Sequence, residues 1–187
     1  MILLNSIEEI DNFLKNNLSE YRYNHSLLVA KEASSLAQYY NLDYNKAYLA
    51  GLVHDIAKEF TDEENNYYIN KYKIDGDLLN DNLKPALHGY IGALFLKEKY
   101  NMDDEICDSV RYHTLGSVNM TLFDKIILVS DKLGRENQDK ELKLLAFENI
   151  DKAVVYILEK QQIKLEAKGM TLYKDTKKLL NKLKCMI

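Results

Sequence analysis

The sequence predicts an all-α protein of a single domain. The chain has 187 residues but only 7 glycines and 1 proline, so it offers few of the turn signals that separate β-strands. No stretch alternates apolar and polar residues in the manner of a half-buried strand. A chain of this length can bury a sizeable core without disulfides or a structural metal. We therefore expect one helical bundle over residues 1–187.

Local signals place the expected helices along the chain. Capping boxes at Ser6-Ile7-Glu8-Glu9 and Thr61-Asp62-Glu63-Glu64 mark two helix starts. Asp43 suits the N-cap of a third helix, and Pro85 is a residue favoured at the first helical position. The expected helices cover about residues 6–18, 20–40, 43–58, 61–72, 85–100, 103–113, 122–133, 140–164 and 173–183.

The expected helices divide into two groups by the residues that they carry. A motif-bearing core spans about residues 20–135, and its polar segment 73–84 is expected to form a flexible loop beside the site. The C-terminal helices, over about residues 139–184, carry no candidate ligand. We expect them to pack the bundle or a partner subunit, which allows a homodimer without requiring one.

Charge and cysteine content exclude several classes of protein. The formal net charge of −4 argues against a nucleic-acid-binding protein, which normally shows an excess of basic residues. Cys107 and Cys185 are too few and too far apart for a disulfide framework or a thiolate metal cage, so both are expected to be idle thiols. The N-terminus does not resemble a signal peptide, and no segment has membrane-spanning length. We therefore expect a cytoplasmic protein.

The helix over residues 20–40 carries the first candidate metal ligand. Leu28, Glu32 and Leu36 recur with His25 at steps of three and four. This spacing places the imidazole on a mostly inward face of the helix. Arg22 lies one turn earlier on the same face.

His54-Asp55 is the most informative dipeptide of the chain. Ala47, Ala50 and Gly51 form a stripe of small residues with His54, along which neighbouring helices can approach closely. By itself, a histidine on such a stripe would be interpreted as a core residue before a metal ligand. Asp55 favours the metal site, because its two carboxylate oxygens can bridge two ions while His54 binds one. Successive helical positions point about 100° apart, so both residues can be ligands only where the helix lines the site.

Asp131 is expected to be a buried carboxylate. Ile127 and Leu128 precede it by four and three positions, which places it on the apolar face of a helix. A buried carboxylate without a counter-charge costs several kcal/mol, so such a residue usually has a cation as its partner. A metal ion is the favoured partner, and a salt bridge to a lysine is the alternative.

Five motifs surround the histidines and aspartates of this chain. They are Tyr21-Arg22-Tyr23-Asn24-His25-Ser26, Ala50-Gly51-Leu52-Val53-His54-Asp55-Ile56-Ala57-Lys58, Leu87-His88-Gly89, Arg111-Tyr112-His113-Thr114 and Val129-Ser130-Asp131-Lys132. Their order resembles that of the HD superfamily of metal-dependent phosphohydrolases, in particular its bacterial YqeK-like branch, from about Asn5 to about Leu180. One position differs, because the branch usually has Glu-Pro before an arginine where this chain has Leu133-Gly134-Arg135.

The resemblance implies an HD-type bundle around a buried site for two divalent metal ions. The resemblance implies that His88 and His113 complete the site and that the metal is iron. Without the resemblance, both histidines would equally fit surface positions at the edges of their helices. Imidazole and carboxylate ligands equally suit manganese, cobalt, nickel or zinc. The implied reaction is symmetrical hydrolysis of diadenosine tetraphosphate to two ADP by a metal-activated water, with Asp55 as the bridging, catalytic carboxylate.

Basic residues near the ligands are candidates for binding phosphate. The chain has only three arginines, namely Arg22, Arg111 and Arg135, and each lies within four residues of a proposed ligand. Lys58 lies one turn after His54. A solvated or ion-paired side chain is the alternative for each of the four, and phosphate is favoured for Arg22 and Arg135 because arginine binds phosphate in bidentate geometry.

Three hydroxyl residues adjoin the ligands. Ser26, Thr114 and Ser130 have no free histidine to serve as a base, since all four histidines are committed to metal. We expect them to hydrogen-bond the ligand side chains and not to act as nucleophiles.

Three other functions remain open at this point. A nucleotidase or pyrophosphatase could use the same metals on mononucleotides, and the resemblance also suggests a link with NAD metabolism. A di-iron site of this kind could activate oxygen, as in an oxygenase. A non-catalytic nucleotide-binding sensor is the third alternative, although a complete set of ligands argues against it.

Overall fold

The computed structural model describes residues 4–80, 83–135 and 137–187, and within these ranges the chain is helical with no strand. This agrees with the all-α prediction. The α-helices and two short 3-10 helices are α1 (Leu4–Asn17), α2 (Glu20–Tyr39), α3 (Tyr44–Val53), α4 (Asp62–Tyr72), η1 (Gly76–Leu79), η2 (Lys84–Ala86), α5 (Leu87–Tyr100), α6 (Asp104–Tyr112), α7 (Leu122–Leu133), α8 (Lys140–Glu148), α9 (Ile150–Glu166) and α10 (Lys174–Lys184).

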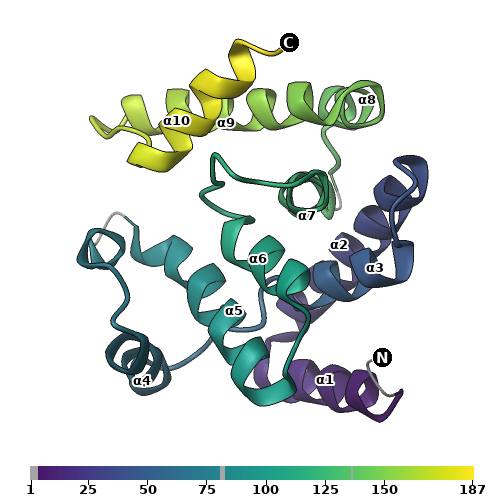
Figure 1. Cartoon of the computed structure of the whole chain (residues 1–187), viewed down its shortest axis with the longest axis vertical. Helices are drawn as coiled ribbons and strands as arrows, with labels where there is room; N and C mark the ends of the chain where they lie inside the picture. The colour runs from purple at the N-terminus through teal and green to yellow at the C-terminus, as the bar shows by residue number, and fades with distance from the viewer. Residues whose placement is uncertain (1–3, 81–82, 136) are drawn as a thin grey trace.

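Helix α7 lies at the centre of the bundle. It packs against α2 and α6 on one side and against α9 on the other (Figure 1). Its apolar residues and Asp131 are buried around most of its circumference, as expected for a helix that is covered on several sides. Helices α8 to α10 cover one end of the molecule, and α1, α4 and α5 extend toward the other. The buried apolar side chains form one core.

Small residues let α2 and α3 pack closely together. A Cβ atom on Gly51 would lie only 2.8 Å from the Cα of Ala30 on α2, so a larger residue at this position would force the two helices apart. This confirms the close approach expected from the stripe of small residues. The inward face of α2 is marked by Val29, Ala33 and Leu36 in addition to His25. Leu28 is 37% exposed and was wrongly assigned to that face.

The capping predictions are confirmed at two of three positions. The Asp43 side chain accepts hydrogen bonds from the backbone N–H groups of Asn45 and Lys46, and Thr61 forms a capping box with Glu64. Helix α1 begins at Leu4, so Ser6 already lies inside it and the N-cap expected at Ser6 is wrong.

Two predicted helices end differently in the structure. The helix expected to reach Lys58 ends at Val53, and tight turns follow to residue 60. The helix expected over 140–164 is broken at Asn149, which has the extended dihedral angles φ −161° and ψ 116°. The Asn149 side chain caps α9 by accepting from the N–H groups of Asp151 and Lys152. Asparagine is a preferred N-cap residue, and this local preference outweighs the continuous helical pattern here.

The segment before α5 is more ordered than predicted. Pro85 lies in the 3-10 helix η2, and α5 itself begins at Leu87. Residues 76–79 form a second 3-10 turn with Leu78 buried, whereas residues 81–82 of the expected loop lie outside the described residues. No helix in the described part of the chain combines the length and the apolar character needed to cross a bilayer.

Candidate metal centre

The bundle brings all six predicted ligand residues into one buried cluster. Each is at most 8% exposed, and His54 is completely buried. A cavity of about 240 Å³ opens onto the cluster. The ligand residues come from separate elements: His25 from α2, His54 and Asp55 from the end of α3 and the turn after it, His88 from α5, His113 from the end of α6, and Asp131 from α7.

The early end of α3 explains how two neighbouring residues can point into the same cluster. His54 is the C-cap of α3, and the following turn is closed by hydrogen bonds from Ile56 N–H to Val53 O and from Lys58 N–H to Asp55 O. In a continuous helix the two side chains would point about 100° apart. The tight turn instead buries both His54 and Asp55, at 0% and 3% exposure.

Three of the four imidazoles are oriented in the same way. Nδ1 donates to a backbone carbonyl in each: His25 to Gly134 at 2.8 Å, His54 to Gly51 at 2.7 Å and His113 to Val110 at 2.6 Å. A carbonyl can only accept, so Nδ1 carries the proton and the lone pair of a neutral ring is at Nε2. Because a backbone hydrogen bond at one ring nitrogen leaves the other to bind metal, these three histidines have the geometry of ligands.

The first group of ligand atoms consists of His25, His54 and Asp131. His25 Nε2 lies 3.1 Å from Asp131 Oδ1, and His54 Nε2 lies 3.7 Å from the same oxygen and 3.6 Å from Asp55 Oδ2. His54 Nε2 is buried and has no hydrogen-bond partner among the described residues. A buried polar atom in this situation is costly, and a cation between this nitrogen and the two carboxylates would satisfy it. The residues therefore fit a metal ion at this position.

The second group of ligand atoms lies on the other oxygen of Asp55. Asp55 Oδ1 is 3.0 Å from His88 Nε2 and 3.7 Å from His113 Nε2, and the two nitrogens are 3.0 Å apart. Asp55 thus presents Oδ2 to the first group and Oδ1 to the second. This is the arrangement that a carboxylate bridging two ions requires.

The electrostatics of the cluster favour positive charge at its centre. Burial by itself would raise the pKa of Asp131, but Lys132, His25 and His54 outweigh burial and hold that pKa well below its usual range. Burial likewise tends to lower the pKa of His54, and the charges of Asp55 and Asp131 reverse this effect and raise it. Burial lowers the pKa of His88 to about 4, against the attraction of Asp55, so this ring is neutral at pH 7 and keeps a lone pair.

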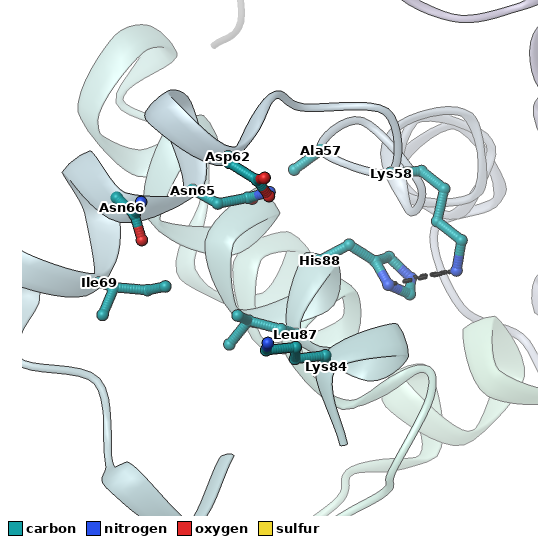
Figure 2. Close-up of a pocket in the computed structure, with 9 residues that line it drawn as sticks. All are labelled: Ala57, Lys58, Asp62, Asn65, Asn66, Ile69, Lys84, Leu87 and His88. Carbon is teal, nitrogen blue, oxygen red and sulfur yellow. Dashed lines mark hydrogen bonds between the residues drawn. The ribbon is translucent and has the colours of Figure 1, made fainter. Parts of the chain in front are cut away.

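Four cationic side chains surround the metal-site cavity. Arg22 Nη1 lies 3.2 Å from Asp55 Oδ2, and Lys132 Nζ lies 2.5 Å from Asp131 Oδ2. Lys58 Nζ lies 3.2 and 3.3 Å from the two ring nitrogens of His88 (Figure 2). Arg135 is exposed and also lines the cavity.

Arg111 does not join these cations, contrary to the prediction from sequence. It does not line the metal-site cavity, and its Nη1 pairs with Asp108 at 3.2 Å. The reason is its position on α6, where two residues before His113 correspond to about 200° around the helix axis. Arg111 therefore points away from the histidine that it precedes.

The three hydroxyl residues differ from one another. Thr114 Oγ1 lies 2.9 Å from His113 Nε2, as expected of a residue that contacts a ligand. Ser26 and Ser130 are completely buried, and their Oγ atoms have no hydrogen-bond partner among the described residues. The prediction that these two serines hydrogen-bond the ligands is therefore wrong, because their neighbouring helical positions turn them into the packed interior.

Two residues of the cavity were missed in the sequence. Lys132 has no role in the sequence prediction, although it directly follows Asp131 in the motif Val129-Ser130-Asp131-Lys132. Asp131 has room for both of its expected partners, a lysine and a metal ion. Its Oδ2 contacts Lys132, while its Oδ1 faces His25. Tyr21 lines the cavity as well, with the Arg22 guanidinium 5.7 Å from its ring centroid. The spacing of residues in the sequence gives no indication that Tyr21 lies at the cavity.

Comparison with known proteins agrees with this fold and cluster. The family model described as the HD domain matches residues 22–147. The chain therefore belongs to the HD-domain family, a family of metal-dependent phosphohydrolases.

Two relatives extend over nearly the whole chain. A protein of Staphylococcus aureus named bis(5'-nucleosyl)-tetraphosphatase, symmetrical, is 33% identical over 183 residues, which cover 94% of this chain and 93% of that protein. A protein of the same name from Bacillus subtilis is 32% identical over 168 residues, or 87% of this chain and 89% of that protein. The resemblance to the YqeK-like branch is thereby confirmed.

A solved structure supports the fold. The crystal structure of a predicted HD superfamily hydrolase involved in NAD metabolism, from Clostridium acetobutylicum, superposes with a TM-score of 0.89 at 31% sequence identity. The alignment covers 97% of this chain and 98% of that one.

Proposed function

We propose that this protein is a metal-dependent phosphohydrolase that cleaves diadenosine tetraphosphate symmetrically into two ADP. The observation that carries the proposal is the position of Asp55, with one carboxylate oxygen facing each of two groups of ligand atoms. The similarity to symmetrical tetraphosphatases over nearly the whole chain supports the substrate. The substrate is a small nucleotide, and the cations around the cavity suit its phosphates.

The residues present fit two divalent ions. His25, His54 and Asp131 would hold one, His88 and His113 would hold the other, and Asp55 would contact both. When bound, such a pair of ions lowers the pKa of a water and neutralises charge on the phosphoryl group. The resemblance to the YqeK-like branch implies iron, although nitrogen and oxygen ligands also suit manganese, cobalt, nickel or zinc.

The cations of the cavity position the polyphosphate. Arg22 and Arg135 offer bidentate geometry, whereas Lys58 and Lys132 act as point charges. Together they offset the charge of the tetraphosphate and hold the scissile bond against the cluster. Positioning and charge neutralisation supply most of the catalysis in phosphoryl transfer, so no covalent nucleophile is needed. ADP leaves as a stable anion, which makes a proton donor unnecessary.

Product analysis tests this proposal directly. The purified protein is stripped with a chelator, reloaded with iron, manganese or cobalt, and incubated with diadenosine tetraphosphate, and the products are separated on an anion-exchange column. We expect no turnover in the stripped protein and two ADP after reloading. Equal amounts of AMP and ATP would overturn the symmetrical cut while leaving a metal-dependent hydrolase.

The same assay separates the alternatives. A nucleotidase or pyrophosphatase would hydrolyse mononucleotides and leave diadenosine tetraphosphate intact. An oxygenase would stop working without oxygen, whereas the proposed hydrolysis continues under anaerobic conditions. A sensor would bind the dinucleotide without forming any product.

A further inference from the structure

We infer that the two nucleoside ends of the substrate bind in two separate pockets, one on each side of the metal-site cavity, and that this two-ended fit selects the central bond. The inference rests on the proposed function. Its basis is that the metal-site cavity adjoins two larger cavities, one beside α4 and one beside α9, which share no lining residue with each other.

The first cavity, here called the α4 pocket, has a volume of about 610 Å³. It shares Lys58 and His88 with the metal-site cavity. Figure 2 shows these two side chains at one end of the pocket and Asn66 with Ile69 at the other. Apolar surface comes from Ala57, Ile69 and Leu87, and polar groups come from Asp62, Asn65 and Asn66.

The second cavity, here called the α9 pocket, has a volume of about 410 Å³. It shares Thr114, Lys132 and Arg135 with the metal-site cavity. Its apolar surface comes from the buried Leu142 and Ile157, and its carboxamides are those of Asn137 and Gln161. Helices α4 and α9 lie far apart in the bundle (Figure 1), and the metal-site cavity shares lining residues with the pocket beside each of them.

Both pockets have the chemistry that a nucleoside requires. Each combines apolar side chains, which can cover the faces of a base, with carboxamides, which can both donate to and accept from its edge. A carboxamide matches the N6 and N7 atoms of adenine in this way. Asn66 lines the α4 pocket and Gln161 lines the α9 pocket. Both volumes fall within the usual range of small-molecule sites.

The distribution of charge matches a dinucleoside polyphosphate. Cationic residues lie at both junctions, with Lys58 between the α4 pocket and the site and Lys132 with Arg135 between the site and the α9 pocket. The pockets also contain charges of both signs, namely Asp62 and Lys84 in the α4 pocket and Lys164 with the ion pair Asp139–Lys160 in the α9 pocket. A dinucleoside tetraphosphate has uncharged nucleosides at its ends and negative charge between them. Placing one nucleoside in each pocket therefore centres the tetraphosphate over the cluster and leaves two phosphates on each side of the cut.

Single substitutions test each pocket separately. We expect Asn66→Ala and Gln161→Ala each to raise the KM for diadenosine tetraphosphate about 3- to 10-fold, the effect of one neutral hydrogen bond. Asn70→Ala on α4 and Gln162→Ala on α9 are matched controls, because these side chains lie outside both pockets. With adenosine tetraphosphate, which has one nucleoside, only one of the two pocket variants should raise KM, and the products should be ADP and pyrophosphate. If either pocket variant keeps the wild-type KM for diadenosine tetraphosphate, the two-pocket assignment is wrong.

Binding of the product ADP provides a readout that does not depend on turnover. In equilibrium dialysis of the metal-loaded protein we expect two ADP per chain, with one of the two sites weakened in each pocket variant. Binding of a single ADP by the wild type would overturn the inference even if diadenosine tetraphosphate gives two ADP. Conversely, two bound ADP without hydrolysis of the dinucleotide would overturn the proposed function and leave the pockets in place.

Discussion

The carbonyl of Gly134 accepts a hydrogen bond from Nδ1 of His25 at 2.8 Å, across 109 positions of the sequence. This contact joins the end of α7 to α2 and turns His25 Nε2 toward Asp131. The close approach requires a glycine, because a Cβ atom on Gly134 would lie 2.8 Å from the backbone nitrogen of Val29. The loop Leu133-Gly134-Arg135 therefore holds the imidazole of His25 in place.

Replacing Gly134 by alanine should disturb the fold and the site together. The added Cβ forces α2 and the end of α7 apart, a change that typically costs about 1–3 kcal/mol. We expect Gly134→Ala to lower both the melting temperature and the bound metal per chain, measured by calorimetry and elemental analysis. Gly76→Ala is the control, since a Cβ there meets nothing within 4 Å. A Gly134→Ala protein with unchanged stability and metal content would contradict this account.

Metal content distinguishes the bridging carboxylate from the other ligands. Asp55→Ala removes a carboxylate whose two oxygens face the two groups of ligand atoms, so we expect it to lose activity and most of the metal. His88→Ala or His113→Ala should leave one ion per chain, because the group of His25, His54 and Asp131 stays intact.

The half-buried Asp108 serves as the control for these metal analyses, since it pairs with Arg111 outside the cluster. Asp108→Ala should keep two ions per chain. Equal loss of metal from Asp55→Ala, His88→Ala and His113→Ala would show that the two-site assignment is wrong.

Two arginines provide a matched pair for phosphate binding. Arg135 lines the metal-site cavity, whereas Arg111 pairs with Asp108 outside it. We expect Arg135→Ala to lower kcat/KM by roughly 10- to 150-fold, equivalent to about 1.5–3 kcal/mol for a charge-assisted hydrogen bond, without loss of metal. Arg111→Ala should keep wild-type kinetics. If steady-state assays show a lower kcat/KM for Arg111→Ala and an unchanged one for Arg135→Ala, Arg111 and not Arg135 binds phosphate.

The two cysteines should differ sharply in reactivity. Burial raises the pKa of Cys107 to about 11, and its side chain is only 4% exposed, while Cys185 is exposed. The thiolate is the reactive form, so a thiol reagent at pH 8 should label one cysteine per folded chain and two after denaturation. Cys185→Ser should remove the fast-reacting thiol. Rapid labelling of both cysteines in the folded protein would contradict the burial of Cys107.

The sequence alone was sufficient for features that depend on local chemistry. The all-α class follows from the scarcity of turn residues, and the starts of α3 and α4 follow from Asp43 and Thr61, whose side chains bond N–H groups two or three positions away. The burial of Asp131 could be predicted because Ile127 and Leu128 mark the apolar face of its own helix. In each case the interacting groups lie within one or two helical turns.

The tertiary structure decided in which direction the side chains near the ends of helices point. The tight turn after Val53 aims both His54 and Asp55 inward, whereas the position of Arg111 on α6 turns it outward. The Gly134 carbonyl reaches His25 only because α2 and α7 pack together, and the two cavities beside the site are lined by elements distant in sequence. Such contacts depend on how whole helices pack, and residue spacing within a single helix cannot specify them.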